Sequence, residues 1–288
     1  MKRIYFSRVV FLTLMMVLVF LSGGKALAET QNRLELNTVM MRNTFKIEGA
    51  GGCGTCFLIG KPLKNDPNKL RAILVTAAHV LEGIKSEEAT ILLRKKQSDN
   101  SFIKIPYPIK IRQGSDILWT KNNSGYDVAV MYISLPDDID FQLLPTTFLA
   151  NDKTLKDFEI HPGDEMFCLG FPKELEANKA GFPVLRSGKV ASYPLVPTQN
   201  EESFMLDFEI FPGNSGGPVY FVESNRYYAG STHLATTIQF IAGIVARQWN
   251  WNETNTNSNK KTHHSLALAD IIHASHILET INQLPEEE

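Results

Sequence analysis

The sequence is poor in cysteine and carries almost no excess of charge of either sign. Only 3 of its 288 residues are Cys, and the formal net charge is −2. A general nucleic-acid binder is excluded, because such proteins need a strongly basic surface. Glycine and proline, at 19 and 14 residues, are too few for a collagen-like or low-complexity chain. With 43% hydrophobic residues, the chain has enough apolar material for a sizeable core.

Long apolar runs are also scarce, and the one near the N-terminus, residues 9–21, is too short to span a bilayer. It is followed at residues 26–28 by Ala-Leu-Ala, a small-x-small pattern that signal peptidase accepts. Three basic residues, Lys2, Arg3 and Arg8, precede the apolar run. We therefore predict a cleaved signal peptide over residues 1–28 and a secreted or periplasmic mature chain, 29–288, with no membrane attachment. The alternative is an uncleaved N-terminal anchor.

The three cysteines are Cys53, Cys56 and Cys168. An odd number in an exported protein leaves at least one thiol free or paired between chains. The Cys53-Gly-Thr-Cys56 spacing invites a redox or zinc interpretation, but the sequence has no second C-x-x-C or H-x3–5-H set to complete a zinc site. We expect a Gly-rich turn with a local disulfide, or two buried free thiols, and neither a metal nor a cofactor.

Short apolar runs separated by turn residues predict an all-β protein, a barrel or sandwich, rather than βαβ units. Examples are residues 55–59, 71–76, 184–192 and 240–247. A late apolar periodicity predicts one C-terminal helix, at residues 266–284; its members are Ile271, Ala274, Leu278 and Ile281. We expect residues 29–48 to form a short leader strand or helix, 136–164 to link two halves, and the polar stretch 249–262 to be an exposed mobile loop.

Two other patterns receive ordinary structural interpretations. Arg94-Lys95-Lys96 is the longest basic run, and we interpret it as a solvated strand end. Four histidines stand near the C-terminus, and two of them, His273 and His276, are three residues apart on the predicted helix, a spacing that suits metal binding. No third ligand converges on that pair in the sequence, so we expect all four on the surface. They are His263, His264, His273 and His276.

Three motifs carry the chemistry. The string Pro-Gly-Asn-Ser-Gly-Gly-Pro at residues 212–218 places Ser215 on a tight turn, where the Gly213 and Ser215 amides could hold an oxyanion. His79 ends the segment Val-Thr-Ala-Ala-His, whose small residues leave room for the imidazole. Asp127 stands at the head of an alternating strand pattern, Tyr-Asp-Val-Ala-Val.

The segments TAAHV, YDVAV and GNSGGP resemble the three catalytic signatures of chymotrypsin-like serine proteases, both in their residues and in their order along the chain. The resemblance implies a double six-stranded β-barrel, with barrels at about 45–135 and 160–265, and a protein or peptide substrate. It implies that Ser215 is the nucleophile, that His79 is the general base and that Asp127 orients His79. Gly213 and Ser215 would form the oxyanion hole.

Finer details resemble one bacterial branch, which contains the HtrA and glutamyl-endopeptidase proteins. Asn214 precedes the serine, and an amide cannot pair with a newly cut N-terminus as an aspartate does in pancreatic-type members. Val80 stands where many animal members have a cysteine beside the histidine. The 73 residues after Ser215 leave no room for the PDZ domain of HtrA proteins.

Specificity is the most open point. By resemblance, Glu209 lines the base of the primary pocket, where a carboxylate would favour a Lys or Arg side chain. Ala246 and Arg247 resemble the edge strand that pairs with the substrate backbone. Arg247 would neutralise Glu209, or itself prefer acidic substrates. The sequence leaves the oligomeric state open, together with an alternative function as a catalytically latent or non-catalytic protein that binds peptides or a partner.

Overall fold

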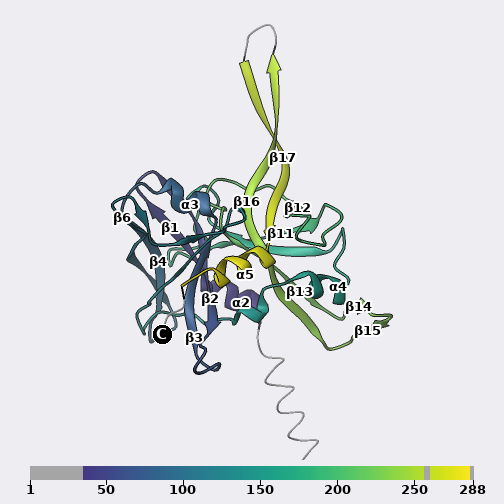
Figure 1. The fold of residues 1–288 in the computed structure, drawn as a ribbon, viewed down its shortest axis with the longest axis horizontal. Coiled ribbons are helices and arrows are strands. Elements are labelled where there is room, and N and C mark those ends of the chain that lie inside the picture. The colour runs from purple at the N-terminus through teal and green to yellow at the C-terminus, as the bar shows by residue number, and fades with distance from the viewer. Residues whose placement is uncertain (1–34, 256–259, 286–288) are drawn as a thin grey trace, which may run out of the picture. The chain divides into compact units, whose positions relative to one another are not determined.

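The computed structural model describes residues 35–255 and 260–285, and the chain divides into two units, Met1–Leu36 and Asn37–Glu288. The fold described here is that of the second unit, which is mostly β (Figure 1). The predicted signal segment, 1–28, lies outside the described residues. No helix within the described ranges is both long enough and apolar enough to cross a bilayer.

The first half of this unit is one antiparallel sheet of seven strands in the order β5-β4-β1-β2-β3-β9-β8. Their bounds are β1 Thr44–Gly49, β2 Gly52–Pro62, β3 Leu70–Thr76, β4 Glu88–Lys96, β5 Phe102–Lys110, β8 Thr120–Lys121 and β9 Ala129–Tyr132. A closed six-stranded barrel was expected here, but no pairing among the described strands joins β5 to β8. Pro106 and Pro108 explain the open end: proline cannot donate to a ladder, so β5 pairs with β4 alone and remains an edge.

The second half is a closed six-stranded barrel, as the predicted fold class requires. Its strands follow in the order β10-β11-β12-β17-β16-β13. Their bounds are β10 Glu165–Gly170, β11 Val184–Val190, β12 Ser203–Asp207, β13 Pro218–Ser224, β16 Thr237–Asn255 and β17 Lys260–His273. Two-stranded hairpins, β6 (Arg112–Gln113) with β7 (Asp116–Ile117) and β14 (Tyr227–Tyr228) with β15 (Ser231–Thr232), stand outside the two sheets.

The helices are short and lie at the ends and junctions. They are α2 Leu36–Asn43, α3 Ala78–Gly83, α4 Asp152–Asp157, α5 Ala274–Asn282 and the 3-10 turns η1 Thr146–Phe148 and η2 Pro172–Glu174. The predicted C-terminal helix therefore begins at Ala274, not at residue 266. Residues 268–272 instead continue β17, because they pair with β12 on one side and β16 on the other.

The predicted mobile loop at 249–262 is also wrong over its described part. Residues up to Asn255 continue β16 and those from Lys260 begin β17, with Trp251 opposite His264 and Thr254 opposite Lys261. Its polar, Asn-rich composition is typical of a loop. Backbone pairing between two long strands does not depend on side-chain polarity, so composition alone was a poor guide.

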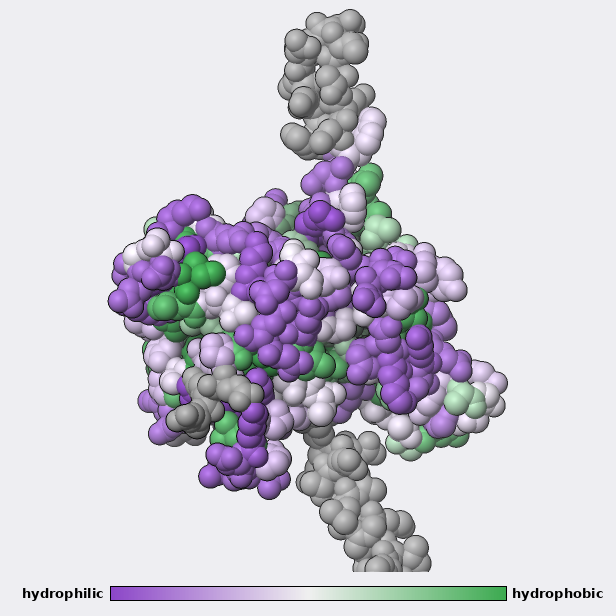
Figure 2. Space-filling view, viewed as in Figure 1, coloured by the Kyte–Doolittle hydropathy of each residue, from purple (hydrophilic) through white to green (hydrophobic). Residues whose placement is uncertain are grey.

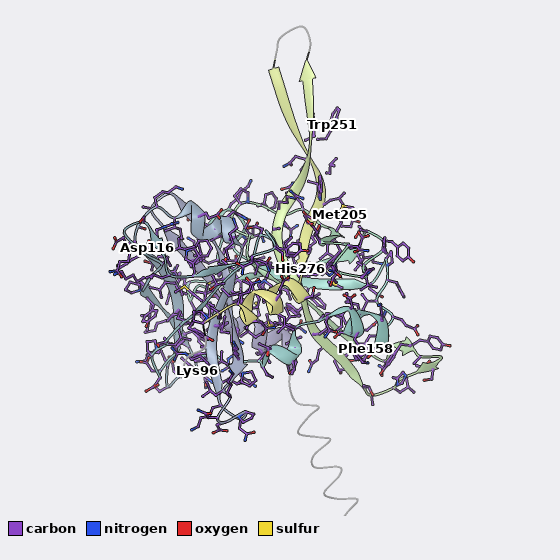
Figure 3. All side chains as sticks on the ribbon, viewed as in Figure 1. Lys96, Asp116, Phe158, Met205, Trp251 and His276 are labelled. Atoms are coloured by element: carbon purple, nitrogen blue, oxygen red, sulfur yellow. The ribbon has the colours of Figure 1, made fainter. Side chains whose placement is uncertain are left out.

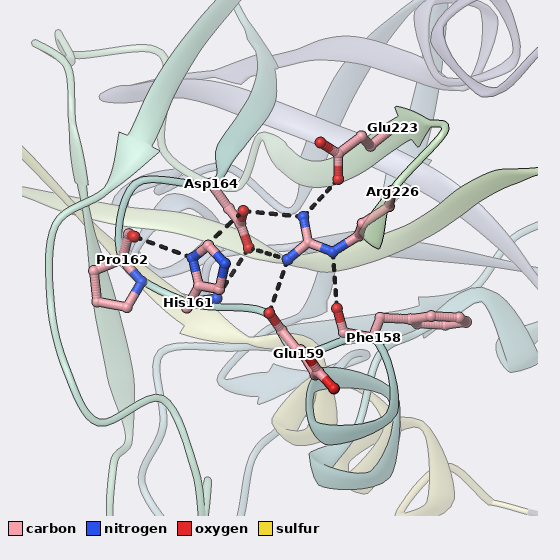
Figure 4. Close-up of polar contacts among 7 residues, drawn as sticks. All are labelled: Phe158, Glu159, His161, Pro162, Asp164, Glu223 and Arg226. Atoms are coloured by element: carbon pink, nitrogen blue, oxygen red, sulfur yellow. Dashed lines mark hydrogen bonds and ion pairs between the residues drawn. The ribbon is translucent and has the colours of Figure 1, made fainter. Parts of the chain in front are cut away.

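A buried arginine, Arg226, ties the end of β13 to the segment that precedes β10 (Figure 4). Its guanidinium donates to both carboxylate oxygens of Asp164, at 3.0 and 2.7 Å, and to Glu223 at 2.5 Å. It also donates to the backbone oxygens of Phe158 and Glu159, at 2.9 and 2.8 Å. All five N–H groups are thus satisfied, which is the condition for burying this cation without a large penalty.

Arg94 departs furthest from its sequence interpretation. The run 94–96 was predicted to be a solvated strand end, but the Arg94 side chain is fully buried. The guanidinium lies between the rings of Phe45 and Phe182, 4.3 and 4.4 Å from their centroids. It donates to four backbone oxygens, those of Met41, Arg42, Thr44 and Gly181. Since Gly181 belongs to the second half of the chain, Arg94 links that half to the first sheet.

All three cysteines are free. Cys53 and Cys56 lie on β2 rather than in a turn, opposite Glu48 and Phe45 of β1, so their side chains leave the strand on opposite faces and no local disulfide forms. Cys56 and Cys168 are fully buried, and burial raises the pKa of the Cys168 thiol to about 12. These two thiols are structural. Of the motif pair Cys53 and Cys56, expected either as a local disulfide or as two buried free thiols, both are free but only Cys56 is buried, whereas Cys53 is half-buried.

His273 and His276, expected on the surface, are both buried at the junction of β17 and α5. His276 is stacked on Tyr126, with 3.6 Å between ring centroids, and His273 packs against Phe204. The Nε2 atoms of both histidines are buried without a hydrogen-bond partner. Burial, reinforced by the neighbouring His276, lowers the pKa of His273 from 6.5 to about 4.

This burial predicts a loss of stability in mild acid. Between pH 6.5 and about 4 the unfolded chain takes up a proton at residue 273 that the folded chain refuses, so acidification favours unfolding there. The stability that the neutral imidazole of His273 gives the folded chain is fully present above pH 6.5 and is lost as the pH falls to about 4. We expect His273→Leu to reduce the loss in unfolding free energy between pH 7 and pH 4.5 by about 2–3 kcal/mol, measured by urea denaturation at both pH values. An unchanged difference would contradict a buried neutral His273.

Candidate active site

His79 and Asp127 meet where two strands of the first sheet end. His79 is the second residue of α3, which begins two residues after β3, and buried Ala77 and Ala78 supply the small residues around it. Asp127 lies two residues before β9, slightly outside the predicted strand. Because β3 and β9 are paired antiparallel, with Thr76 opposite Ala129, the end of one adjoins the start of the other.

Two hydrogen bonds fix the histidine on the aspartate. The ring Nδ1 lies 2.6 Å from Asp127 Oδ2, and the backbone N–H of His79 donates to Oδ1 at 2.9 Å. The hydrogen bond to Asp127 raises the pKa of His79, although partial burial opposes it. Burial would raise the pKa of Asp127, but the bonds from His79 outweigh it and lower that pKa. The pair therefore favours an ionised aspartate beside an imidazole that binds a proton readily.

Ser215 lies on a turn that is tied to both halves of the chain. Its carbonyl oxygen accepts from the Thr55 amide of β2 at 2.9 Å, and the Thr55 hydroxyl donates to the Gly213 oxygen at 2.6 Å. The next amide, of Gly216, donates to Val245 of β16 at 2.8 Å. Ser215 Oγ itself donates only to the Ala246 oxygen, at 3.4 Å, and has no hydrogen bond with His79 in the described part of the chain.

Glycine is required at two positions of this turn. Gly213 and Gly216 have φ angles of +98° and +81°, in the left-handed region. A Cβ on Gly213 would stand 2.1 Å from the Phe171 oxygen, and one on Gly216 would stand 2.2 Å from Thr76 Oγ1. The two glycines thus allow the serine turn to pack directly on neighbouring backbone and strand ends.

The amides of Gly213 and Ser215 are free to bind an oxygen. The Pro212 carbonyl accepts from the Lys173 amide at 2.7 Å, and in a planar trans peptide the N–H points the opposite way, so the Gly213 N–H is directed away from Lys173. Neither this amide nor that of Ser215 donates to another backbone oxygen among the described residues. Two unoccupied donors two residues apart are the arrangement that stabilises a developing oxyanion.

All three predicted catalytic residues line a single cleft of about 560 Å³. The set that lines it is His79, Asp127, Ile210, Phe211, Pro212, Ser215, Ala246, Arg247, Gln248 and Asn250. Gln248 and Asn250 were not predicted, because they fall in the stretch interpreted as a loop or beside it. Within the described ranges, no group of three or more His, Cys, Asp or Glu side chains is placed to hold a metal ion.

The sequence profile of the trypsin-like peptidase domain matches residues 54–229, more than half of the chain and all three motifs. The chain belongs to the trypsin-like peptidase family. A comparison with curated proteins finds no match.

The solved structures similar to this peptidase include two that are described as proteases, Rv3671c and Anisep. Rv3671c from M. tuberculosis H37Rv, in an inactive mutant form, is 14% identical, with 89% of this chain and 95% of that chain covered and a TM-score of 0.44. The protease Anisep from Arthrobacter nicotinovorans is 12% identical, with coverages of 84% and 94% and a TM-score of 0.44. The protein HBP is 12% identical, with coverages of 86% and 94% and a TM-score of 0.46.

Of the three residues predicted to set specificity, two line the cleft and one does not. Glu209 is not among the residues that line the cleft; its backbone oxygen accepts from Arg186, whose guanidinium lies over the rings of Phe208 and Phe211. Ala246 and Arg247 do line the cleft. Arg247 pairs with the buried carboxylate of Asp270 at 2.7 Å rather than with Glu209. Ile210, Phe211 and Pro212, which follow Glu209 in the chain, line the cleft beside Ser215.

Proposed function

We propose that this peptidase is an exported serine endopeptidase that cleaves peptide bonds through an acyl-enzyme. The observation that carries the proposal is the single cleft lined by His79, Asp127 and Ser215, with the two free amides of Gly213 and Ser215 beside the serine. Family membership supports a peptide or protein substrate. Export rests on the signal-like pattern of residues 1–28.

Each step has a group in the cleft. His79 Nε2 takes the proton of Ser215 Oγ as the oxygen attacks the substrate carbonyl, and Asp127 stabilises the imidazolium that forms. The carbonyl oxygen becomes an oxyanion held by the two amides. His79 then gives the proton to the leaving amine, and an ester joins the substrate to Ser215. Water, deprotonated by His79, attacks the ester carbonyl; the bond to Ser215 Oγ breaks, His79 returns the proton to that oxygen, and the acyl part of the substrate leaves as a carboxylic acid.

Ser215 must rotate for the first step. In the resting structure its hydroxyl donates to the Ala246 oxygen at 3.4 Å, a long and therefore weak bond. A substrate backbone that pairs with β16 at Ala246 would compete for that oxygen and release the hydroxyl toward His79. The resting contact thus costs little to break.

The test is covalent labelling with a fluorophosphonate probe, which reacts with activated serines. We expect the mature wild-type protein to be labelled, and both Ser215→Ala and His79→Ala to lose labelling while keeping a native circular dichroism spectrum. A folded wild-type protein that is not labelled would refute the enzymatic function and favour a latent or peptide-binding protein. Labelling that persists in Ser215→Ala would refute the nucleophile.

The proposed base predicts the pH dependence. His79 must be neutral to accept the serine proton, and its bond to Asp127 raises its pKa above the ordinary 6.5. We therefore expect kcat/KM to be full at high pH and to fall as pH drops through a single pKa above 6.5. The measurement is hydrolysis of an uncharged peptide between pH 5 and 9. A profile flat over this range, or a midpoint below 6.5, would contradict the assignment.

A further inference from the structure

The loop that carries Asp127 has little packing of its own. It joins β8 to β9 over residues 122–128, and the residues at its tip, 123–125, are exposed. A pocket of about 190 Å³ adjoins Gly125, Tyr126 and Asp127, and a Cβ added to Gly125 would meet no atom within 4 Å. The loop therefore depends on contacts with other elements for a fixed position.

One helix of the other half holds this loop. Helix α5 follows β17 of the barrel and packs on β9 of the first sheet (Figure 1). The buried Asn122 side chain donates to Thr280 Oγ1 of α5 at 2.9 Å, and the Ser124 hydroxyl donates to Glu279 at 2.8 Å. These contacts are polar, and the surface over α5 is mainly hydrophilic (Figure 2). The loop is thus tied to the half of the chain that carries Ser215.

Two stacked rings join the helix to the residue before Asp127. His276, in the first turn of α5, lies against Tyr126 with 3.6 Å between ring centroids and 27° between ring planes. The His276 ring is buried at the junction of the two halves (Figure 3), and its Nε2 has no hydrogen-bond partner among the described residues. Its Nδ1 lies 3.4 Å from Glu279, a long and therefore weak bond. The main contact of this ring is therefore its face, which supports Tyr126.

Tyr126 transmits its position to Asp127 through the backbone. The Val128 amide donates to the Tyr126 oxygen at 2.8 Å, which closes a three-residue turn with Asp127 at its centre. A shift of Tyr126 therefore shifts the carboxylate. The two bonds between His79 and that carboxylate, at 2.6 and 2.9 Å, form only where the carboxylate now stands.

We propose that His276 is a positioning residue: its ring holds Tyr126, and through it Asp127, where the carboxylate meets His79. This inference rests on the proposed function, in which Asp127 orients His79. Without the ring, Tyr126 loses the support of one face, and the adjoining pocket leaves the loop room to move. A displacement of about 1 Å in a catalytic group costs about 10²-fold in rate. Helix α5, which follows the barrel in the sequence, thus completes a pair that belongs to the first sheet.

Two other roles for His276 give different results. If the residue were purely structural, its removal would lower the folded fraction, while the pKa of His79 and the kcat of each active site would stay as in the wild type. If it acted through its charge or its bond to Glu279, phenylalanine could not replace it. Phenylalanine keeps the ring face and loses both nitrogens, so His276→Phe separates support by stacking from these polar roles.

The first test reads the position of Asp127 without catalysis. In the Ser215→Ala protein with ¹³C-labelled histidine, NMR titration gives the pKa of His79, whose signal is assigned by its loss in His79→Ala. The bond to Asp127 is the main cause that raises this pKa above 6.5. We expect the added His276→Ala to lower the pKa of His79, and the added His276→Phe to leave it unchanged. An unchanged pKa in a folded His276→Ala protein would overturn the proposal.

The second test measures kcat and KM for a peptide that the wild type cleaves, with the concentration of active sites taken from fluorophosphonate labelling. We expect His276→Ala to lower kcat about 10²-fold with little change in KM, and the midpoint of its pH profile to fall. His276→Phe should retain most of the wild-type kcat. The control is Tyr132→Phe, which removes a bond of 3.1 Å from β9 to the Pro285 oxygen, just beyond α5 and outside the loop. An equal loss of kcat in the control would assign the effect to a loosened helix and overturn the proposal.

A second pair of variants approaches the stack from the loop. Tyr126 is only half-buried, so Tyr126→Ala removes the stack at less risk to folding and replaces His276→Ala if that variant does not fold. We expect the same loss of kcat and the same fall in the pKa of His79, and Tyr126→Phe should show neither. The double variant with His276→Ala should lose no more than either single variant, because both remove one contact.

The two proposals fail separately. If the wild-type protein is not labelled by the fluorophosphonate, the proposed function fails, while the NMR titration still decides whether His276 positions Asp127. If labelling and cleavage succeed but kcat survives in folded His276→Ala and Tyr126→Ala proteins, the positioning proposal fails alone.

Discussion

Ser215→Ala is expected to lower kcat about 10⁶-fold, because it removes the one protein atom proposed to bond to the substrate carbon. The fold should survive. The turn is held by backbone bonds from Thr55 to Ser215 and from Gly216 to Val245, and by the Thr55 hydroxyl on Gly213. The deleted hydroxyl makes one bond of 3.4 Å, so its loss leaves no buried partner strongly destabilised.

The measurement is kcat on a peptide that the wild type cleaves, with thermal unfolding of both proteins in parallel. The matched control is Ser224→Ala, at the end of β13, whose exposed hydroxyl has Thr237 as its one partner among the described residues. We expect the control to keep its kcat and both variants to melt within a few degrees of the wild type. A Ser215→Ala protein that retained a tenth of the wild-type kcat would require a different nucleophile.

The three motifs were predictable because each coincides with a strand end. His79 follows β3, Asp127 precedes β9, and Ser215 precedes β13, so short-range patterns located all three within two or three residues. Their meeting in one cleft depends on the pairing of β3 with β9 and on the bond from Thr55 to Ser215. The family resemblance supplied that long-range information, which the local patterns lack.

The errors came from residues whose environment is built by distant parts of the chain. Arg94 belongs to a basic run, yet its partners lie about fifty residues before it and almost ninety after it. His276 is covered by Tyr126, and His273 by Phe204. Local periodicity contains no trace of these contacts, so polar residues that end up buried were assigned to the surface.

Composition misled the interpretation of residues 249–262 for a related reason. The polar stretch after Trp249 lacks the apolar alternation that marks a half-buried strand, but a ribbon outside the barrel has no buried face and needs none. Its exposed tryptophans, set in a polar context, were the available signal.

Asp127→Asn is expected to lower kcat about 10⁴-fold with little change in structure. The carboxylate accepts from the His79 amide at Oδ1 and faces the ring Nδ1 at Oδ2. An asparagine can keep the first bond with its oxygen, and its NH₂ then faces Nδ1. Since an NH₂ only donates, Nδ1 must become the acceptor and the ring proton moves to Nε2. His79 then presents a proton to Ser215 where it should present a lone pair.

The variant therefore separates orientation from charge, and its pH profile is part of the prediction. Without the carboxylate, the main cause of the raised pKa of His79 is gone, so the residual activity should titrate at a lower pH than in the wild type. The control is Asp140→Asn, which breaks an equivalent pair with Arg42 in the first half of the chain and should leave kcat unchanged. The measurement is kcat and kcat/KM between pH 5 and 9 for all three proteins. If Asp127→Asn kept more than a tenth of the wild-type kcat, Asp127 would be a structural partner of His79 and the proton transfer would need another explanation.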